Sequence, residues 1–284
     1  MDQSAISLQT LFPHLLTAVT FFLTTYLIGL ALYRVTKQLL PEYLGEYVGD
    51  FFKTMLICAY PFGHGIVRRE IGDIGFLCLL VLIMLPTLAT IGGDGSPISV
   101  WIKFFRKKIS VSKTIIKTVV MMTSGFVGFW FGLVILKLEL QSVLFNLPKL
   151  PPLPTSCKSF LIIPGYQGFL LELVAVMYDS WFSAQKLSSN PLIDVVIKIV
   201  NTGTLVIAGF HLTGMFIHPP KAFGYSWGCP PTSHAVHMLV YWVAPFIGAW
   251  LSRHLQDRLR LEWSDPPRKT NKGGKPGTNK EKTS

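Results

Sequence analysis

Long apolar stretches separated by short polar segments dominate the pattern of this sequence. Each approaches the roughly 20 residues that an α-helix needs to cross the hydrocarbon core of a bilayer. They cover residues 11–33, 45–62, 74–91, 114–136, 161–183, 191–212 and 235–252. The pattern therefore predicts an all-α transmembrane protein with seven apolar segments.

The first apolar stretch, residues 11–33, is predicted to stay in the mature protein as an additional N-terminal helix. It is longer than the apolar region of a secretory signal peptide. It also lacks a basic segment before it and a small-residue cleavage site after it. The remaining six segments then form the core of the molecule.

Two amphipathic segments between the apolar stretches, 92–108 and 217–231, are too short to cross a bilayer. Proline suits the first position of a helix, because its missing N–H would have no partner there. The prolines lie in Ser96-Pro97-Ile98 and in His218-Pro219-Pro220. We predict two re-entrant half-helices, at about 96–107 and about 218–229. Such broken helices are tolerated in a bilayer only where they line a cavity or are buried in protein, and they mark permeation sites.

The spacing of buried carboxylates indicates an internal repeat. Asp50 precedes Ser96 by 46 residues, and Glu172 precedes His218 by the same 46. Ionisable groups inside membrane segments usually serve a function or a specific structural need. The chain is accordingly divided into an N-terminal helix and basic linker (1–40), a first pore repeat (41–136), a non-cytoplasmic loop (137–162), a second pore repeat (163–254) and a basic, disordered tail (255–284).

Composition supports a membrane protein, with 50% hydrophobic residues, 14% charged residues and a mean hydropathy of +0.45. Soluble domains carry about 25% charged residues. The net charge of +11 is concentrated in the tail after Arg253, which follows an apolar segment directly. Such a charge is better explained by the positive-inside rule than by nucleic-acid binding. We therefore expect no nucleic-acid partner.

The basic residues also predict the orientation. Those at Arg34, Lys37, 106–108, Lys186 and in the tail fall on one side when the six-segment core is threaded alternately, and that side is expected to be cytoplasmic. Arg68 and Arg69 fall on the opposite side, against the rule.

Two stretches resemble the signature regions of the aquaporin (major intrinsic protein) family. The second half reads LTGMFIHPPKAFGYSWGC followed by HMLVYWVAPFIGAWL. His218 stands where the family has Asn, and the matching signature positions are Thr213, Gly214, Pro219, Lys221, Ala222, Phe223 and Gly224. The first half, GDGSPISVW, matches less closely, with Ser96 at the Asn position. These departures, together with the extra N-terminal segment, resemble the unorthodox superaquaporin branch.

The resemblance implies a right-handed bundle of six helices and two half-helices arranged as an inverted repeat, here with the extra N-terminal helix. It implies a passive channel for water or small neutral solutes such as glycerol or hydrogen peroxide, without a cofactor or a metal. It also implies homotetramers with one pore per subunit. The protein would be multi-pass in an intracellular membrane, such as the endoplasmic reticulum, or in the plasma membrane, with its C-terminal tail in the cytoplasm.

The resemblance further implies roles for individual residues. The pore signatures are Ser96, Pro97, Ile98, His218, Pro219 and Pro220, and the outer constriction is formed by Phe76, Val206, Met215 and Lys221. Asp50 and Glu172 would accept hydrogen bonds from the re-entrant loops, satisfying backbone N–H groups that are costly to bury alone. His218, expected to be neutral at pH 7, either faces the pore or only caps its half-helix and a neighbouring carbonyl.

Several alternatives remain open from sequence. Cys157 and Cys229 both fall in loops on the non-cytoplasmic side, where they form either a disulfide or two unpaired thiols. The chain could be a non-conducting structural or regulatory membrane protein with the same fold. A seven-helix receptor is a remote reading. So is a membrane enzyme using His234 and His237 with Asp179 or Asp194, since no metal-binding motif accompanies them.

Overall fold

The computed structural model describes residues 8–145, 157–259 and 261, and these residues form helices and connecting turns without a strand. The long helices are α1 (Leu8–Leu39), α2 (Gly45–Ala59), α3 (Pro61–Thr90), α5 (Val111–Lys137), α7 (Gly165–Ser183), α8 (Pro191–Thr213) and α11 (Ala244–Arg258). The short helices are α4 (Pro97–Phe105), α6 (Leu140–Phe145), α9 (Pro219–Ser226) and α10 (His234–Met238). A 3-10 turn at Glu42–Leu44 precedes α2, and a π-helical turn at Leu239–Val243 joins α10 to α11. Most of the predicted C-terminal tail lies outside the described residues.

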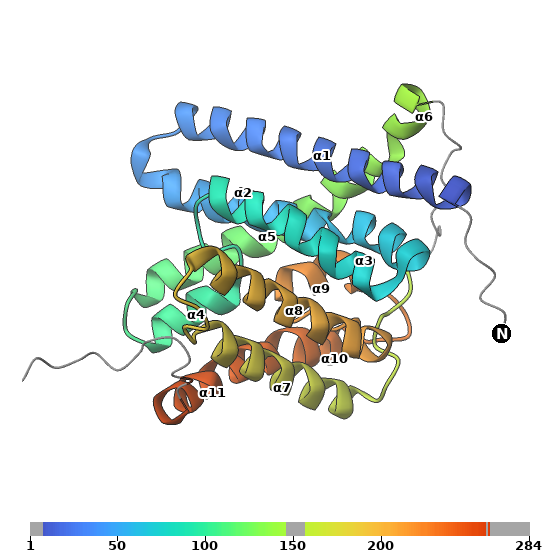
Figure 1. Ribbon diagram of the computed structural model, residues 1–284. Helices are drawn as coiled ribbons and strands as arrows, with labels where there is room; N and C mark the ends of the chain where they lie inside the picture. The colour runs from blue at the N-terminus through green and yellow to red at the C-terminus, as the bar shows by residue number, and fades with distance from the viewer. Residues whose placement is uncertain (1–7, 146–156, 260, 262–284) are drawn as a thin grey trace, which may run out of the picture.

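The N-terminal helix α1 packs along the outside of α2 and α3 (Figure 1). Phe21 and Phe22 are almost fully buried and contact the region around Tyr60 and Gly63. On its other face α1 leaves Leu23 and Leu27 more than half exposed. One face of this helix therefore completes the core of the first half, and the other carries apolar side chains on the surface.

Helix α3 corrects the expected boundary between the second and third apolar segments. The sequence predicts a polar linker over 63–73, but the chain is helical from Pro61 and breaks only at Gly72. Gly72 has φ 83° and ψ −167°, a backbone conformation that residues other than glycine rarely adopt. An unbroken helix over the 49 residues of Glu42–Thr90 would be about 74 Å long, far more than a bilayer core of about 30 Å. The Gly72 break divides this stretch.

Five of the described helical stretches are long and apolar enough to cross a membrane, fewer than the seven predicted segments. They are Phe12–Leu39, Glu42–Thr90, Val111–Leu144, Pro191–Thr213 and His234–Arg258. The difference arises because two predicted segments merge in Glu42–Thr90 and because α7 does not qualify. Helix α7 carries Gln167, Glu172 and Asp179, which lower its apolar character.

The short helix α9 lies among the long helices, and the short helix α4 lies at the left of the view, packed against α5 and α11 (Figure 1). Close approach by α5 holds α9 in place, since a Cβ at Gly125 would lie only 2.5 Å from Pro220. One turn later, a Cβ at Gly128 would lie 2.4 Å from the carbonyl oxygen of Met55 on α2. Glycines on α5 therefore allow α2, α5 and α9 to pack at backbone distance.

Charged residues at several helix ends gather at one end of the molecule. Arg253 of α11 donates to the carbonyl of Phe105 at the end of α4 (2.6 Å). Lys113 near the start of α5 pairs with Glu46 near the start of α2. The C-terminal ends of α1, α4 and α11 all lie at the left of the view in Figure 1.

Candidate pore

The two short helices begin in the same way. Ser96 precedes α4, and its hydroxyl accepts a hydrogen bond from the N–H of Ile98 (3.3 Å). His218 precedes α9, and its Nδ1 accepts a hydrogen bond from the N–H of Lys221 (3.3 Å). Each helix therefore has a side-chain cap on one of the N–H groups that a helix start leaves without a partner.

The cap of α9 also contacts the residue that precedes the cap of α4. Nε2 of His218 lies 2.9 Å from the carbonyl oxygen of Gly95, the residue before Ser96, although the two are 123 residues apart. A carbonyl can only accept, so Nε2 carries the proton and Nδ1 is the acceptor. A neutral imidazole satisfies both bonds. This is the geometry of the capping alternative for His218, although the side chain also borders the central cavity.

A fully buried carboxylate supports the loop before α9. Glu172 on α7 accepts hydrogen bonds from Thr213 Oγ1 (2.8 Å) and from the backbone N–H groups of Phe216 (3.1 Å) and Ile217 (3.0 Å). Its side chain has no solvent exposure. The tip of α9 thus depends on one side chain from another helix.

The corresponding carboxylate in the first half, Asp50, accepts a hydrogen bond from the N–H of Asp94 (2.6 Å) and belongs to an ionic network. Lys117 on α5 lies 3.0 Å from Asp50, 2.6 Å from Asp94 and 2.6 Å from Glu46. Lys103 pairs with Asp94 as well. Lys117 was not singled out from the sequence, because a lysine near the start of an apolar segment gives no sign of distant partners.

A cavity of about 540 Å³ lies between the two halves. Its wall includes both caps, Ser96 and His218, and the side chains of Phe76, Val206 and Lys221. The wall also includes charged side chains, both near Ser96 and beyond the end of α4, which are Asp94, Lys103, Arg106, Lys108 and Asp179.

Three of the four residues expected at the constriction, Phe76, Val206 and Lys221, border this cavity. Met215 does not: it is 3% exposed, and its side chain packs against Gly209 of α8. His64 borders the cavity instead, with its ring 5.2 Å from that of Phe76. No pattern in the sequence indicates His64, because it falls between the apolar segments expected at 45–62 and 74–91, in a stretch that is helical in the structure.

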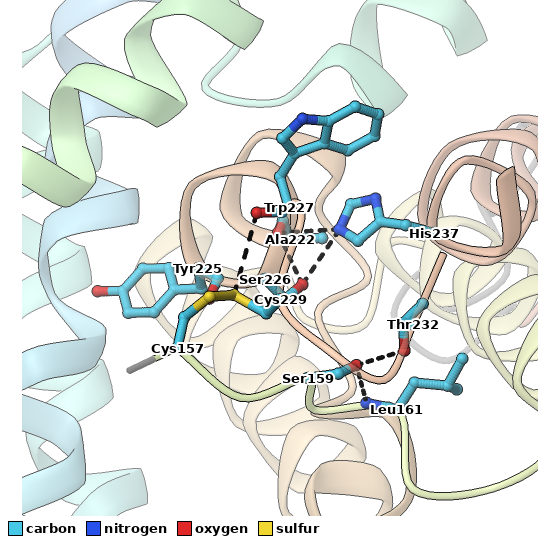
Figure 2. Close-up of a disulfide and its surroundings, with 10 residues drawn as sticks. All are labelled: Cys157, Ser159, Leu161, Ala222, Tyr225, Ser226, Trp227, Cys229, Thr232 and His237. Atoms are coloured by element: carbon cyan, nitrogen blue, oxygen red, sulfur yellow. Dashed lines mark hydrogen bonds between the residues drawn. A yellow bond between two sulfur atoms is a disulfide. The ribbon is translucent and has the colours of Figure 1, made fainter. Parts of the chain in front are cut away.

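Cys157 and Cys229 are joined in a disulfide, with their Cα atoms 5.3 Å apart (Figure 2). Hydrogen bonds reinforce the junction: Ser159 N–H donates to the Pro230 carbonyl (3.0 Å), and the Ser159 hydroxyl lies 2.6 Å from Thr232 Oγ1. The disulfide therefore ties the segment before α7 to the turn that follows α9.

Replacing Cys229 with serine is expected to lower the free energy of unfolding by about 2–4 kcal/mol, because the bond closes a long loop in the unfolded chain. Unfolding in detergent, followed by circular dichroism, measures the change. Cys78→Ser is the control, because Cys78 is exposed and unpaired. Mass spectrometry that finds four free thiols in the unreduced wild-type protein would contradict the bond.

The residues of the enzyme alternative do not come together. His237 on α10 contacts Ser226 Oγ (3.1 Å) and the Ala222 carbonyl (3.3 Å). Asp179 on α7 instead accepts from Asn201 and Thr202 of α8. Within the part of the chain that the structure describes, no group of three or more His, Cys, Asp or Glu is arranged to hold a metal ion.

The chain shows a distant similarity to a known protein. The chain is 20% identical over 262 residues to aquaporin-11 of Milnesium tardigradum, covering 91% of this chain and 93% of that protein. No family model matches the sequence. The similarity extends over both halves of the chain. Together with the apolar helices, it identifies the chain as an integral, multi-pass membrane protein related distantly to an aquaporin.

Proposed function

We propose that this protein is a passive transmembrane channel for water and small neutral solutes such as glycerol or hydrogen peroxide. The observation that carries the proposal is the hydrogen bond between His218, the cap of α9, and Gly95, just before the cap of α4, in the wall of a cavity of about 540 Å³. In this arrangement the two short helices are re-entrant half-helices of an inverted repeat. Together with six crossing helices they surround one pore per subunit.

The chemistry of the cavity favours small uncharged hydrogen-bonding molecules. The cavity has room for several water molecules. The N-termini of α4 and α9 carry the positive ends of their helix dipoles, which disfavour cations and protons at the tips. Ser96 and the Lys221 side chain offer donors to a passing oxygen, and Phe76 and Val206 supply apolar wall.

A second candidate function is a non-conducting structural or regulatory membrane protein with the same fold. It is favoured by the hydrogen bonds of His218, whose two ring nitrogens are both used within the protein. No ring nitrogen then remains to orient a solute at the tip of α9. Pro220 follows at the position where the aquaporin signature has alanine.

Stopped-flow light scattering on proteoliposomes separates these functions. The channel predicts osmotic water or glycerol permeability above that of empty vesicles. Ser96→Trp is expected to reduce either flux to the level of empty vesicles, because an indole at this position fills the cavity beside Gly95. Ser189→Trp, in the exposed turn between α7 and α8, is the control and should leave the flux unchanged. Wild-type permeability equal to empty vesicles for both solutes would support the non-conducting function.

We also propose the assembly and orientation that follow from the family resemblance. The protein would form homotetramers in an intracellular membrane, in keeping with the superaquaporin branch. The end that carries Arg106, Lys113 and Arg253 would face the cytoplasm, because basic residues concentrate on that side of membrane proteins.

A further inference from the structure

Lys221 is a charged group without a protein partner. It lies in the first turn of α9, and its side chain borders the cavity. Among the described residues its ammonium has no hydrogen bond and no carboxylate within ion-pair distance. Other lysines in similar surroundings are paired: Lys53 with the Gly93 carbonyl (2.8 Å) and Lys117 with three carboxylates. A charge removed from bulk water needs such a partner.

The nearby carboxylates are already engaged. Both oxygens of Glu172 accept hydrogen bonds from the loop before α9, and this side chain does not border the cavity. Asp94 is paired with Lys103 and Lys117. Asp179 accepts from two side chains of α8. None of these groups is free to neutralise Lys221.

His64 provides a second unsatisfied group in the same wall. The residue is 9% exposed, and its Nε2 has no hydrogen-bond partner in the described structure. Its ring is held by aromatic contacts with Phe22 (5.0 Å), Phe76 (5.2 Å) and Tyr60 (6.5 Å) between centroids. A neutral imidazole protonated at this nitrogen is a hydrogen-bond donor.

The side chains that line the cavity carry a net positive charge. Its basic side chains are Lys103, Arg106, Lys108 and Lys221, and its acidic side chains are Asp94 and Asp179. The N-termini of α4 and α9 add partial positive charge near Ser96 and His218. A cation at the start of a helix, as Lys221 is, raises this potential further.

We propose that the cavity contains a binding site for a small monovalent anion, held by the Lys221 ammonium and an N–H of the His64 ring, which borders the same cavity. One unpaired ammonium neutralises one negative charge. The second charge of a divalent anion would lie against the apolar side chains of Phe76 and Val206, without a partner. Chloride and nitrate have the required size and charge. The bound anion would occupy the path of neutral solutes and lower their flux. This effect on flux rests on the proposed function, whereas anion binding does not.

Broadening of the chloride NMR line by the detergent-solubilised full-length protein tests the binding. Chloride is varied against gluconate at constant ionic strength, so that screening stays fixed. Lys221→Met is expected to weaken binding at least about tenfold, the effect of losing one hydrogen bond to a charged group. His64→Phe keeps the aromatic packing and should also weaken binding. Lys137→Met, which removes an exposed lysine at the end of α5, should have no effect.

The outcomes are distinct. Equal broadening by the wild-type protein and by Lys221→Met, with both monodisperse on size exclusion, would overturn the anion site. Equal loss in Lys137→Met would do the same, since it would indicate nonspecific attraction. If Lys221→Met does not fold, Lys221→Gln and His64→Phe provide the comparison. In proteoliposomes, nitrate should lower glycerol flux in the wild type and not in Lys221→Met. Anion binding without any flux would refute the channel and leave the anion site standing.

Discussion

Replacing Lys117 with methionine is expected to lower the free energy of unfolding by about 3–5 kcal/mol, because it leaves buried carboxylates without their shared cation. The Lys117 side chain is 2% exposed, and its partners Asp50 and Asp94 are 0% and 8% exposed. Methionine fills nearly the same volume, so the loss reflects charge rather than packing. Unfolding by denaturant in detergent measures the change.

Lys113→Met is the matched control. Lys113 lies one turn earlier on α5 and pairs with the same Glu46, but both side chains are more than one-third exposed. Such a surface pair contributes at most about 1 kcal/mol. Combining Lys117→Met with Asp50→Asn should restore part of the stability, because Lys117 is the cation that pairs with Asp50 and the uncompensated charge is removed. Equal losses for Lys117→Met and Lys113→Met would show that the network contributes no more than a surface pair.

Replacing Glu172 with alanine is expected to lower the free energy of unfolding by at least about 3 kcal/mol. Three donors, the Thr213 hydroxyl and the N–H groups of Phe216 and Ile217, would lose their acceptor in a buried position. Each unsatisfied buried donor costs about 1–3 kcal/mol. The yield of monodisperse protein and its melting temperature in detergent measure the loss.

Glu70→Ala is the control for Glu172, because Glu70 pairs with Arg69 at the surface of α3. Its loss should be small. Glu172→Gln should fall between the two variants, since the amide keeps one acceptor oxygen and turns its NH₂ group toward another donor. A melting temperature for Glu172→Ala equal to that of Glu70→Ala would mean that water or another group replaces the carboxylate.

Features that depend on nearby residues follow from the sequence. The apolar stretches indicate helices because length and hydropathy are properties of a continuous segment. The bounds expected for the short helices, about 96–107 and 218–229, lie within three residues of those of α4 and α9. This agreement arises because Ser or His before Pro caps a helix through its own neighbouring N–H groups.

The positions of Met215 and His64 relative to the cavity depend on the direction of the backbone, which the sequence pattern does not specify. Sequence offsets place Met215 at the cavity, but the backbone there is at φ 40°, and the side chain packs against α8. His64 reaches the cavity because the helix continues from Pro61 to the break at Gly72. The conformation of a single residue alters which of the following side chains face the cavity. The number of residues between two positions does not specify that conformation.

The sequence by itself determined that this is a helical membrane protein with two proline-initiated short helices and an equal carboxylate spacing in each half. Only the tertiary structure decided which groups are paired. His218 reaches Gly95 across 123 residues, and Lys117 reaches Glu46 across 71. Lys221 has no such partner among the residues that the structure describes. The local sequence pattern determines backbone conformation, whereas helix packing determines the partner of a buried polar group. In this protein the packing leaves the Lys221 ammonium at the cavity.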